Sequence, residues 1–294
     1  MINFRYHVVS IIGIFIALAV GVVLGAGPLQ RSINAGMNPS SSQAASDPVL
    51  SAQAEAEAAG LKALASSTLT GSLTGTSVAL VVLPGASDDD VSAIRSTLTD
   101  AGASVVGRVT LTDNWQSTSM SQYRTTLATT LASHLQSSGA KTASADGVVG
   151  YSIVQVLTST GAETDLLRQI LTDKSTPLMT IDEDPAGKAT TLVAVGARAQ
   201  TTTSTQASAA ASSDAWIGLG LAVGSTSGVV VGDASSREAM ISQIRTSGTA
   251  VTTVDSVGTT LASVDTALAL STASSGARAF GVGNGAQSVI PSSK

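Results

Sequence analysis

The chain has 294 residues, 15 Lys and Arg against 20 Asp and Glu, a formal net charge of −5 and no cysteine. The missing cysteine excludes disulfides, zinc–thiolate sites and thiol nucleophiles. The acidic balance argues against nucleic-acid partners, because Lys and Arg against phosphate supply most of the energy of such binding.

The chain opens with a long apolar segment. Residues 8–27 carry no charge, and about 20 residues at ~1.5 Å each span the ~30 Å hydrocarbon core of a bilayer. A secretory signal has an apolar region of only ~7–15 residues before its cleavage site, and here Pro28 follows the small residues directly. We expect a retained transmembrane anchor; a cleaved signal and a buried core helix of a soluble protein are the alternatives.

The orientation of this anchor is inferred from the rest of the chain. Arg5 precedes the segment and Arg31 follows it, so the charge difference across it is small. The following sequence is rich in Ser, Thr, Ala and Gly and poor in Lys, which suits an extracytoplasmic domain. We therefore expect residues 1–30 to form a cytoplasmic tip and an anchor in the lipid bilayer, with the main domain outside the cytoplasm in the cell envelope.

Small residues recur along the apolar segment. Gly13, Ala17, Gly21 and Gly25 are spaced by four positions, which places them on one helical face where two backbones could approach closely. This spacing favours a homo-oligomer formed through the transmembrane helix. The alternative is that Gly and Ala are simply common in membrane helices.

Residues 31–76 separate the anchor from the first predicted strand. Their first part contains Asn-Pro and a run of Ser, which has too little apolar content to bury and predicts a flexible linker. The Ala-rich stretch from Pro48 to Ser66 predicts a short helix. Sustained heptads are missing, so a coiled coil is not expected.

An α/β pattern begins at Ser77. The apolar run SVALVVLPG predicts a strand buried on both faces of a parallel sheet. The next segment predicts a helix, with Ser87 as N-cap, three Asp in the first turn and Gly102 as the stop. ASVVGRVTL then predicts a second strand, which completes a β-α-β unit.

The alternation continues through the rest of the chain. DLLRQILTD and SSREAMISQIRTSG predict helices, while TLVAVGA, GVVVGDA and AVTTVDSV predict strands. We expect residues 77–294 to form one α/β domain with a Rossmann-like, doubly wound, mostly parallel sheet. Residues 197–214 are of low complexity and predict a surface loop.

Two acidic runs could suggest a cation site. Asp88, Asp89 and Asp90 point in different directions around a helix start, so capping and dipole compensation explain them better than metal binding. Residues 182–184 (Asp-Glu-Asp) would need oxygen donors from elsewhere to hold a hard cation, and we interpret them as a solvated turn. The sequence identifies no metal ligands.

Phosphate and nucleotide motifs are incomplete. The loop at residues 84–87 meets a helix N-terminus, a place that binds anions in some α/β folds, but no lysine accompanies it. Near the end, Gly281, Gly283 and Ala286 match G-x-G-x-x-A, yet only eight residues follow, whereas a dinucleotide fingerprint opens a helix and needs an acidic residue further on. We interpret this segment as a glycine-rich tail and expect no bound cofactor.

Catalytic and soft-metal residues are few. His7 lies at the predicted membrane edge and His134 on a predicted helix over residues 121–139, without a G-x-S-x-G motif anywhere. Besides Met1, the chain has four scattered methionines, whereas Cu(I) prefers several sulfur ligands. We expect no enzyme and no dedicated copper motif.

Three stretches carry a resemblance to a known family. FRYHVVSIIGIFIALAVGVVLGAGPLQ, SVALVVLPGASDDDVSAIRSTLTDAGASVVGRVTLTDNW and FGVGNGA are similar to the actinobacterial family of mycobacterial copper transport protein B. The resemblance implies a channel-forming or copper-efflux protein of the cell envelope with copper as the transported ion. Members of that family tend to follow the anchor with a longer helical spacer, which is here replaced by the Ser/Ala linker.

A channel function is difficult to reconcile with one predicted membrane span. A pore needs several spanning helices or a closed barrel, and this chain offers one predicted span. Our hypothesis is a single-pass protein that supports copper export and homeostasis, with an oligomer or a partner supplying the path. The alternative is a membrane-anchored structural or interaction protein without transport activity. An anchored enzyme at the carboxyl edge of the sheet lacks a catalytic constellation, although a deep polar pocket there would revive it.

Overall fold

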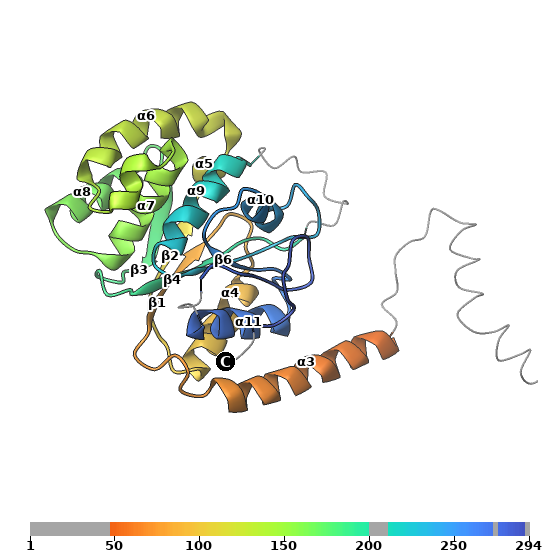
Figure 1. Cartoon of the computed structure of the whole chain (residues 1–294). Coiled ribbons are helices and arrows are strands. Elements are labelled where there is room, and N and C mark those ends of the chain that lie inside the picture. The colour runs from red at the N-terminus through yellow and green to blue at the C-terminus, as the bar shows by residue number, and fades with distance from the viewer. Residues whose placement is uncertain (1–47, 200–210, 273–275, 292–294) are drawn as a thin grey trace, which may run out of the picture. The chain divides into compact units, whose positions relative to one another are not determined.

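The computed structural model describes residues 48–199, 211–272 and 276–291. The chain divides into two compact units, Met1–Ala56 and Glu57–Lys294. The division falls inside helix α3 (Pro48–Leu69), which includes the short helix predicted from Pro48 to Ser66. All the strands, and every helix after α3, belong to the second unit (Figure 1).

The second unit is a mixed α/β domain built on a seven-stranded, mostly parallel sheet. Its strand order is β3-β2-β1-β4-β5-β6-β7, and only the β2–β3 pair is antiparallel. The strands are β1 (Ser77–Val82), β2 (Ser104–Leu111), β3 (Met179–Glu183), β4 (Thr191–Val195), β5 (Val229–Val231), β6 (Thr252–Val254) and β7 (Ala279–Phe280). The order runs outward in both directions from β1 and β4.

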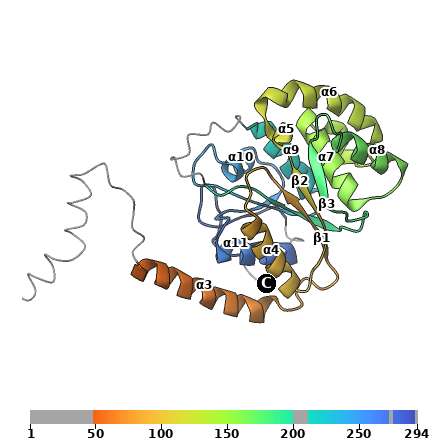
Figure 2. The same cartoon turned by 180° about the vertical axis from the view of Figure 1, so that it is seen from behind.

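Helices cover both faces of this sheet. Figures 1 and 2 show α4 and α11 on one face, against which the C-terminal part of α3 also packs, and α5 to α10 on the other. The helices are α4 (Asp88–Asp100), α5 (Asp113–Gln116), α6 (Ser121–Leu131), α7 (Ala145–Thr158), α8 (Ala162–Leu171), α9 (Ser213–Gly224), α10 (Met240–Thr246) and α11 (Thr260–Ser271). Short 3-10 turns lie at Thr118–Met120 (η1), Ala132–His134 (η2) and Ser138–Thr142 (η3).

The continuous apolar run of β1 is explained by these two covered faces. Successive side chains of a strand point to opposite faces of the sheet. Ala79 and Val81 belong to the hydrophobic core on one face, whereas Val78, Leu80 and Val82 belong to the core on the other. All five are almost completely buried, as the sequence predicted for a central parallel strand.

Helix α4 also forms where the sequence predicted it. The Ser87 side chain accepts a hydrogen bond from the backbone of Asp89, which caps the first turn. Val91, Ile94 and Leu98 are buried on one face. Gly102 has φ +94°, a left-handed conformation that glycine adopts readily and that ends the helix.

Other elements differ from the sequence prediction. The helix predicted over residues 121–139 ends at Leu131, and the chain turns through η2 and η3 instead. The helix predicted over residues 235–248 begins only at Met240. Helix α9 takes the last two residues of the predicted loop 197–214, whose central residues 200–210 lie outside the described part of the chain.

Helices α7 and α9, which the sequence pattern did not reveal, pack at unusually short range. A Cβ on Gly150 would lie 2.6 Å from the carbonyl oxygen of Gly218, and a Cβ on Gly218 would lie 2.6 Å from that of Asp146. These distances are shorter than real Cβ contacts, so glycine is required at both positions. The close approach explains the glycines inside two otherwise apolar helices.

The predicted anchor stays a prediction. In residues 48–199, 211–272 and 276–291, no helix combines the length and the apolar character needed to cross a bilayer. Residues 8–27, and with them the Gly13/Ala17/Gly21/Gly25 face, lie outside this range.

Candidate functional site

The carboxyl ends of the parallel strands form a polar cavity. Ligands of open α/β sheets usually bind at this edge. The cavity has a volume of about 490 Å³, and the loops that follow β4, β5, β6 and β7 line it. Its polar side chains are those of Asp233, Ser235, Asp255, Ser256 and Asn284.

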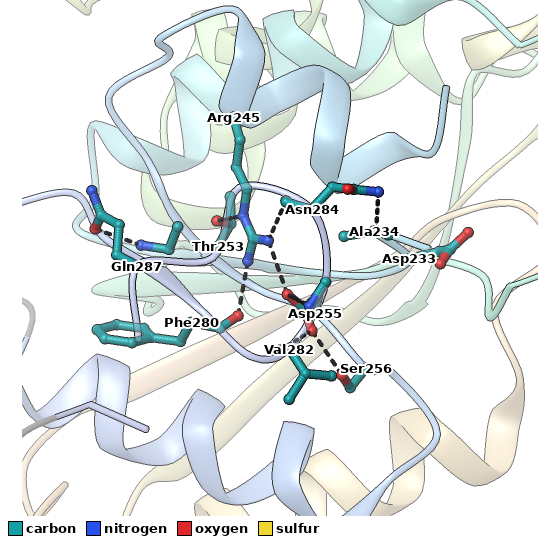
Figure 3. Close-up of polar contacts among 12 residues, drawn as sticks. Asp233, Ala234, Arg245, Thr253, Asp255, Ser256, Phe280, Val282, Asn284 and Gln287 are labelled. Atoms are coloured by element: carbon teal, nitrogen blue, oxygen red, sulfur yellow. Dashed lines mark hydrogen bonds and ion pairs between the residues drawn. The ribbon is translucent and has the colours of Figure 1, made fainter. Parts of the chain in front are cut away.

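Asp255, which lines this cavity, forms a buried ion pair with Arg245 (Figure 3). The guanidinium of Arg245 on α10 donates from Nη1 to Oδ2 of Asp255 at 2.9 Å, and the side chains are 7% and 1% exposed. Arg245 also donates to the Thr253 hydroxyl and to the backbone oxygens of Phe280 and Asn284. The arginine thus joins α10, β6 and the loop after β7.

Asp255 is fully engaged by donors. It accepts hydrogen bonds from the Ser256 hydroxyl at 2.7 Å and from the backbone amides of Val282 at 2.8 Å and Gly283 at 3.0 Å, in addition to Arg245. Burial alone would raise the pKa of Asp255, but these hydrogen bonds outweigh it and hold the pKa below its usual value. Burial lowers the pKa of Arg245, although Asp255 opposes this effect.

The GVGNGA segment packs against the Asp255 carboxylate and lines one side of the cavity. Gly281 has φ +120°, and a Cβ there would collide with the Asp255 carboxylate. A Cβ on Gly283 would lie 2.7 Å from that of Ala234. The glycines therefore allow the backbone to approach the carboxylate, which is a structural reason for this motif.

The interpretation of this segment as a tail was wrong. Strand β7 comes directly before the segment and pairs in parallel with β6. The backbone amides of the segment itself donate hydrogen bonds to Asp255. The sequence did carry a signal, because an apolar pair followed by G-x-G is compatible with a strand end. The acidic partner, however, precedes the motif instead of following it.

Asp265 on α11 has a different environment. Its side chain is completely buried, and neither carboxylate oxygen has a hydrogen-bond partner among the described residues. Burial, helped by the negative charge of Asp255, raises the pKa of Asp265 to about 7. The sequence gives no sign of this environment, because an Asp within a helix is usually exposed to solvent.

The Asp side chains at the start of α4 point to different partners, as predicted. Asp88 pairs with Arg108 at 2.6 Å, whereas the buried Asp90 accepts two hydrogen bonds from Arg198, at 2.8 and 2.6 Å. Arg198 follows β4, so this pair ties the loop after β4 to the helix after β1. The strand order reverses at these two strands.

Residues 182–184 are solvent-exposed, as predicted, but they do not form a turn. Asp182 and Glu183 end the antiparallel edge strand β3, and each of the three acids meets an arginine from another element. Asp182 lies 3.4 Å from Arg108, while Glu183 and Asp184 form two-pronged pairs with Arg95 and Arg168. These arginines lower the pKa values of Glu183 and Asp184 and fix the position of the edge strand.

The soft-metal candidates are engaged separately. His134 ends η2 and pairs through Nδ1 with Glu163. Met179 is part of the core on β3, and Met240 lies against Gly196 and Gly232. Across the described ranges, no three His, Asp or Glu side chains are placed to hold a metal ion.

A comparison with models of known protein families finds a match over most of the chain. The family model described as "Copper transport outer membrane protein, MctB" matches residues 1–291. No curated protein matches the chain. Because the family model covers nearly all 294 residues, the chain belongs to the MctB copper transport outer membrane protein family.

Proposed function

We propose that this chain is a single-pass protein of the cell envelope that supports copper export and copper homeostasis. The observation that carries the proposal is the family match, which runs from the first residue through the predicted anchor to the end of the folded domain. The predicted span at residues 8–27 would hold the α/β domain at a membrane surface. Copper is the cargo in this proposal and not a resident cofactor.

The α/β domain would act without holding copper itself. A tight Cu(I) site needs several sulfur or imidazole donors converging at bond distance. Here the Met179 side chain is packed in the core, Met240 fills the space beside two glycines, and His134 is paired with Glu163. We therefore propose that a path for copper comes from an oligomer, formed through the Gly13/Ala17/Gly21/Gly25 face, or from a partner protein.

We propose no enzymatic activity at the carboxyl-edge cavity. The Ser256 hydroxyl donates to Asp255, and the same carboxylate is held by Arg245 and two backbone amides. A carboxylate whose oxygens already accept four hydrogen bonds is a poor base, because its lowered pKa disfavours proton uptake. This arrangement supports a role in stabilising the loop after β7.

The test is copper accumulation in a strain that lacks the gene. Cells complemented with the intact chain should restore a low copper content, and cells complemented with a chain lacking residues 1–30 should not. Zinc content, measured in parallel, should stay constant. Gly21→Ile should weaken both self-association of the predicted anchor and copper export if the oligomer supplies the path, because it removes the close backbone approach.

Copper content that is unchanged by the deletion would contradict the proposal. That result would favour the alternative, an anchored structural or interaction protein of the envelope. The two variants separate the parts of the proposal, since the truncation tests anchoring and Gly21→Ile tests the oligomer.

A further inference from the structure

A second cavity lies on the opposite side of the domain from helices α7 and α9. It has a volume of about 350 Å³ and lies between the C-terminal part of α3, helix α4 and the start of α11. All its lining residues fall between Lys62 and Val264, inside the second unit. Nothing in the copper proposal uses this space.

Small side chains on three helices create the cavity. Ala65 on α3, Ala93 on α4 and Ala262 and Ser263 on α11 all line it. The space is open to solvent, since Ala93 is exposed. Its volume lies within the range of about 300–1,000 Å³ that is typical of ligand pockets.

The floor of the cavity is apolar. Leu69, Ile94 and Val264 line it and are only 3%, 2% and 5% exposed. These side chains belong to the hydrophobic core on the α4/α11 face of the sheet. These three side chains offer no hydrogen-bonding group, so a ligand that reaches them gains most by burying hydrocarbon there. The cavity is also lined by hydroxyl groups, among them those of Ser66, Thr97 and Ser263.

The rim carries charges of both signs. Lys62 is cationic and Asp89 and Asp100 are anionic, while Arg198 is paired with the buried Asp90. A rim of mixed charge does not select one head group. It keeps a polar head in contact with water while the tail lies between the helices.

We propose that this cavity binds a single acyl chain. A water molecule's share of liquid volume is ~30 Å³, and a methylene group is of similar size, so about 350 Å³ accepts a chain of roughly a dozen carbons. The predicted anchor would bring lipid acyl chains near the domain. About 20 residues separate it from α3, and a flexible chain of that length would span roughly 25 Å on average.

The experiment uses the full chain reconstituted in phospholipid vesicles. Two photoactivatable probes carry the same diazirine-labelled dodecanoyl chain, one as the free fatty acid and the other as a phosphatidylcholine in the vesicle. After irradiation, mass spectrometry maps the labelled peptides. We expect the label in the domain to concentrate on the peptides that contain Ala93 to Thr97 and Ala262 to Val264, and to be displaced by unlabelled dodecanoate.

A matched pair of variants tests the location. Ala93→Phe places a large side chain in the cavity and should reduce this labelling about tenfold, the effect of a binding free energy lost by roughly 1.4 kcal/mol. Ser92→Phe, at the neighbouring exposed position outside the lining, should leave it unchanged. Circular dichroism shows whether both variants fold.

Each possible outcome either supports or overturns the proposal that the cavity binds an acyl chain. Labelling by only one probe supports the site and identifies its source as a free fatty acid or a membrane lipid. Labelling that is spread evenly over the domain, or that is equal in the two variants, overturns the proposal. If Ala93→Phe does not fold, displacement in the unmodified chain decides the question, because labelling that unlabelled dodecanoate cannot displace also overturns it.

Discussion

Arg245 on α10 meets Asp255 at the end of β6 at 2.9 Å, and both side chains are almost completely buried. The pair is not an isolated one, since Asp255 also binds two backbone amides of the loop after β7. One carboxylate therefore holds together a helix, a strand end and the last loop of the described chain. Its removal should affect the whole carboxyl edge of the sheet.

Asp255→Ala should strongly destabilise the domain. Removing one member of a buried pair leaves the other charge uncompensated, which costs about 3–5 kcal/mol. The measurement is the free energy of unfolding from denaturant titration. Asp88→Ala is the matched control, because Asp88 pairs with Arg108 while its own side chain is 82% exposed, and exposed pairs contribute only ~0–1 kcal/mol. Equal losses in the two variants would show that burial of the Arg245 pair has no special weight.

Gly281→Ala should also destabilise the domain. The residue has φ +120°, and the added Cβ would collide with Asp255. Gly276→Ala separates the two causes, because Gly276 has φ +92° but open space around it. Backbone strain alone costs about 1–3 kcal/mol, so Gly281→Ala should exceed Gly276→Ala in a denaturant titration. A smaller effect at Gly281 would mean that the loop moves away from Asp255 without cost.

Asp265 should make stability depend on pH. Its pKa in the folded domain is about 7, above the ordinary 3.8, so between these values the folded state binds more protons than the unfolded state. The contribution of Asp265 to stability should therefore be largest below pH 3.8 and should fall as the pH rises through this window, by roughly 4 kcal/mol in all. Asp265→Asn, which is neutral throughout, should remove this fall.

The comparison needs denaturant titrations at pH 5 and pH 8. Between pH 5 and pH 8 the unmodified chain should lose stability relative to Asp265→Asn, and Asp265→Asn should be clearly the more stable at pH 8. The opposite sign at pH 8 would mean that the Asp265 carboxylate finds a partner when it ionises.

Gly218→Ala should disrupt the contact between α7 and α9. The new Cβ would lie 2.5–2.6 Å from backbone atoms of Asp146, which cannot give way as a side chain can. Gly60→Ala in α3 is the control, because a Cβ there meets nothing within 4 Å and Ala favours a helix over Gly by roughly 0.5–1 kcal/mol. Circular dichroism during heating should show a lower midpoint for Gly218→Ala. A midpoint no lower than that of the Gly60 variant would refute the packing argument.

The sequence predicted those elements whose signals are local. Strand β1 follows from its unbroken apolar run, and α4 follows from Ser87 as a cap and from the spacing of Val91, Ile94 and Leu98. The mostly parallel sheet follows from their alternation with further strands. Each strand or helix of this kind is recognised from residues within one short window.

The candidate site could not be predicted in this way, because its contacts join distant segments. Asp255 binds amides 27 and 28 positions later in the chain. Glu183 on β3 looked like part of a turn because its partner, Arg95, lies 88 positions earlier. Helix α7 is buried nearly all round and has no amphipathic period to reveal it.

The last prediction tests the copper proposal on the full chain. Purified in lipid vesicles, the protein should not compete with a Cu(I) chelator at one ion per chain, because the Met179, Met240 and His134 side chains are each engaged in a different place and a tight soft-metal site needs converging donors. Met240→Leu and His134→Gln should leave the competition curve unchanged. Stoichiometric binding that either substitution abolishes would reveal a copper site within one chain, and copper export would then have to be explained by that site instead of by an oligomeric path or a partner.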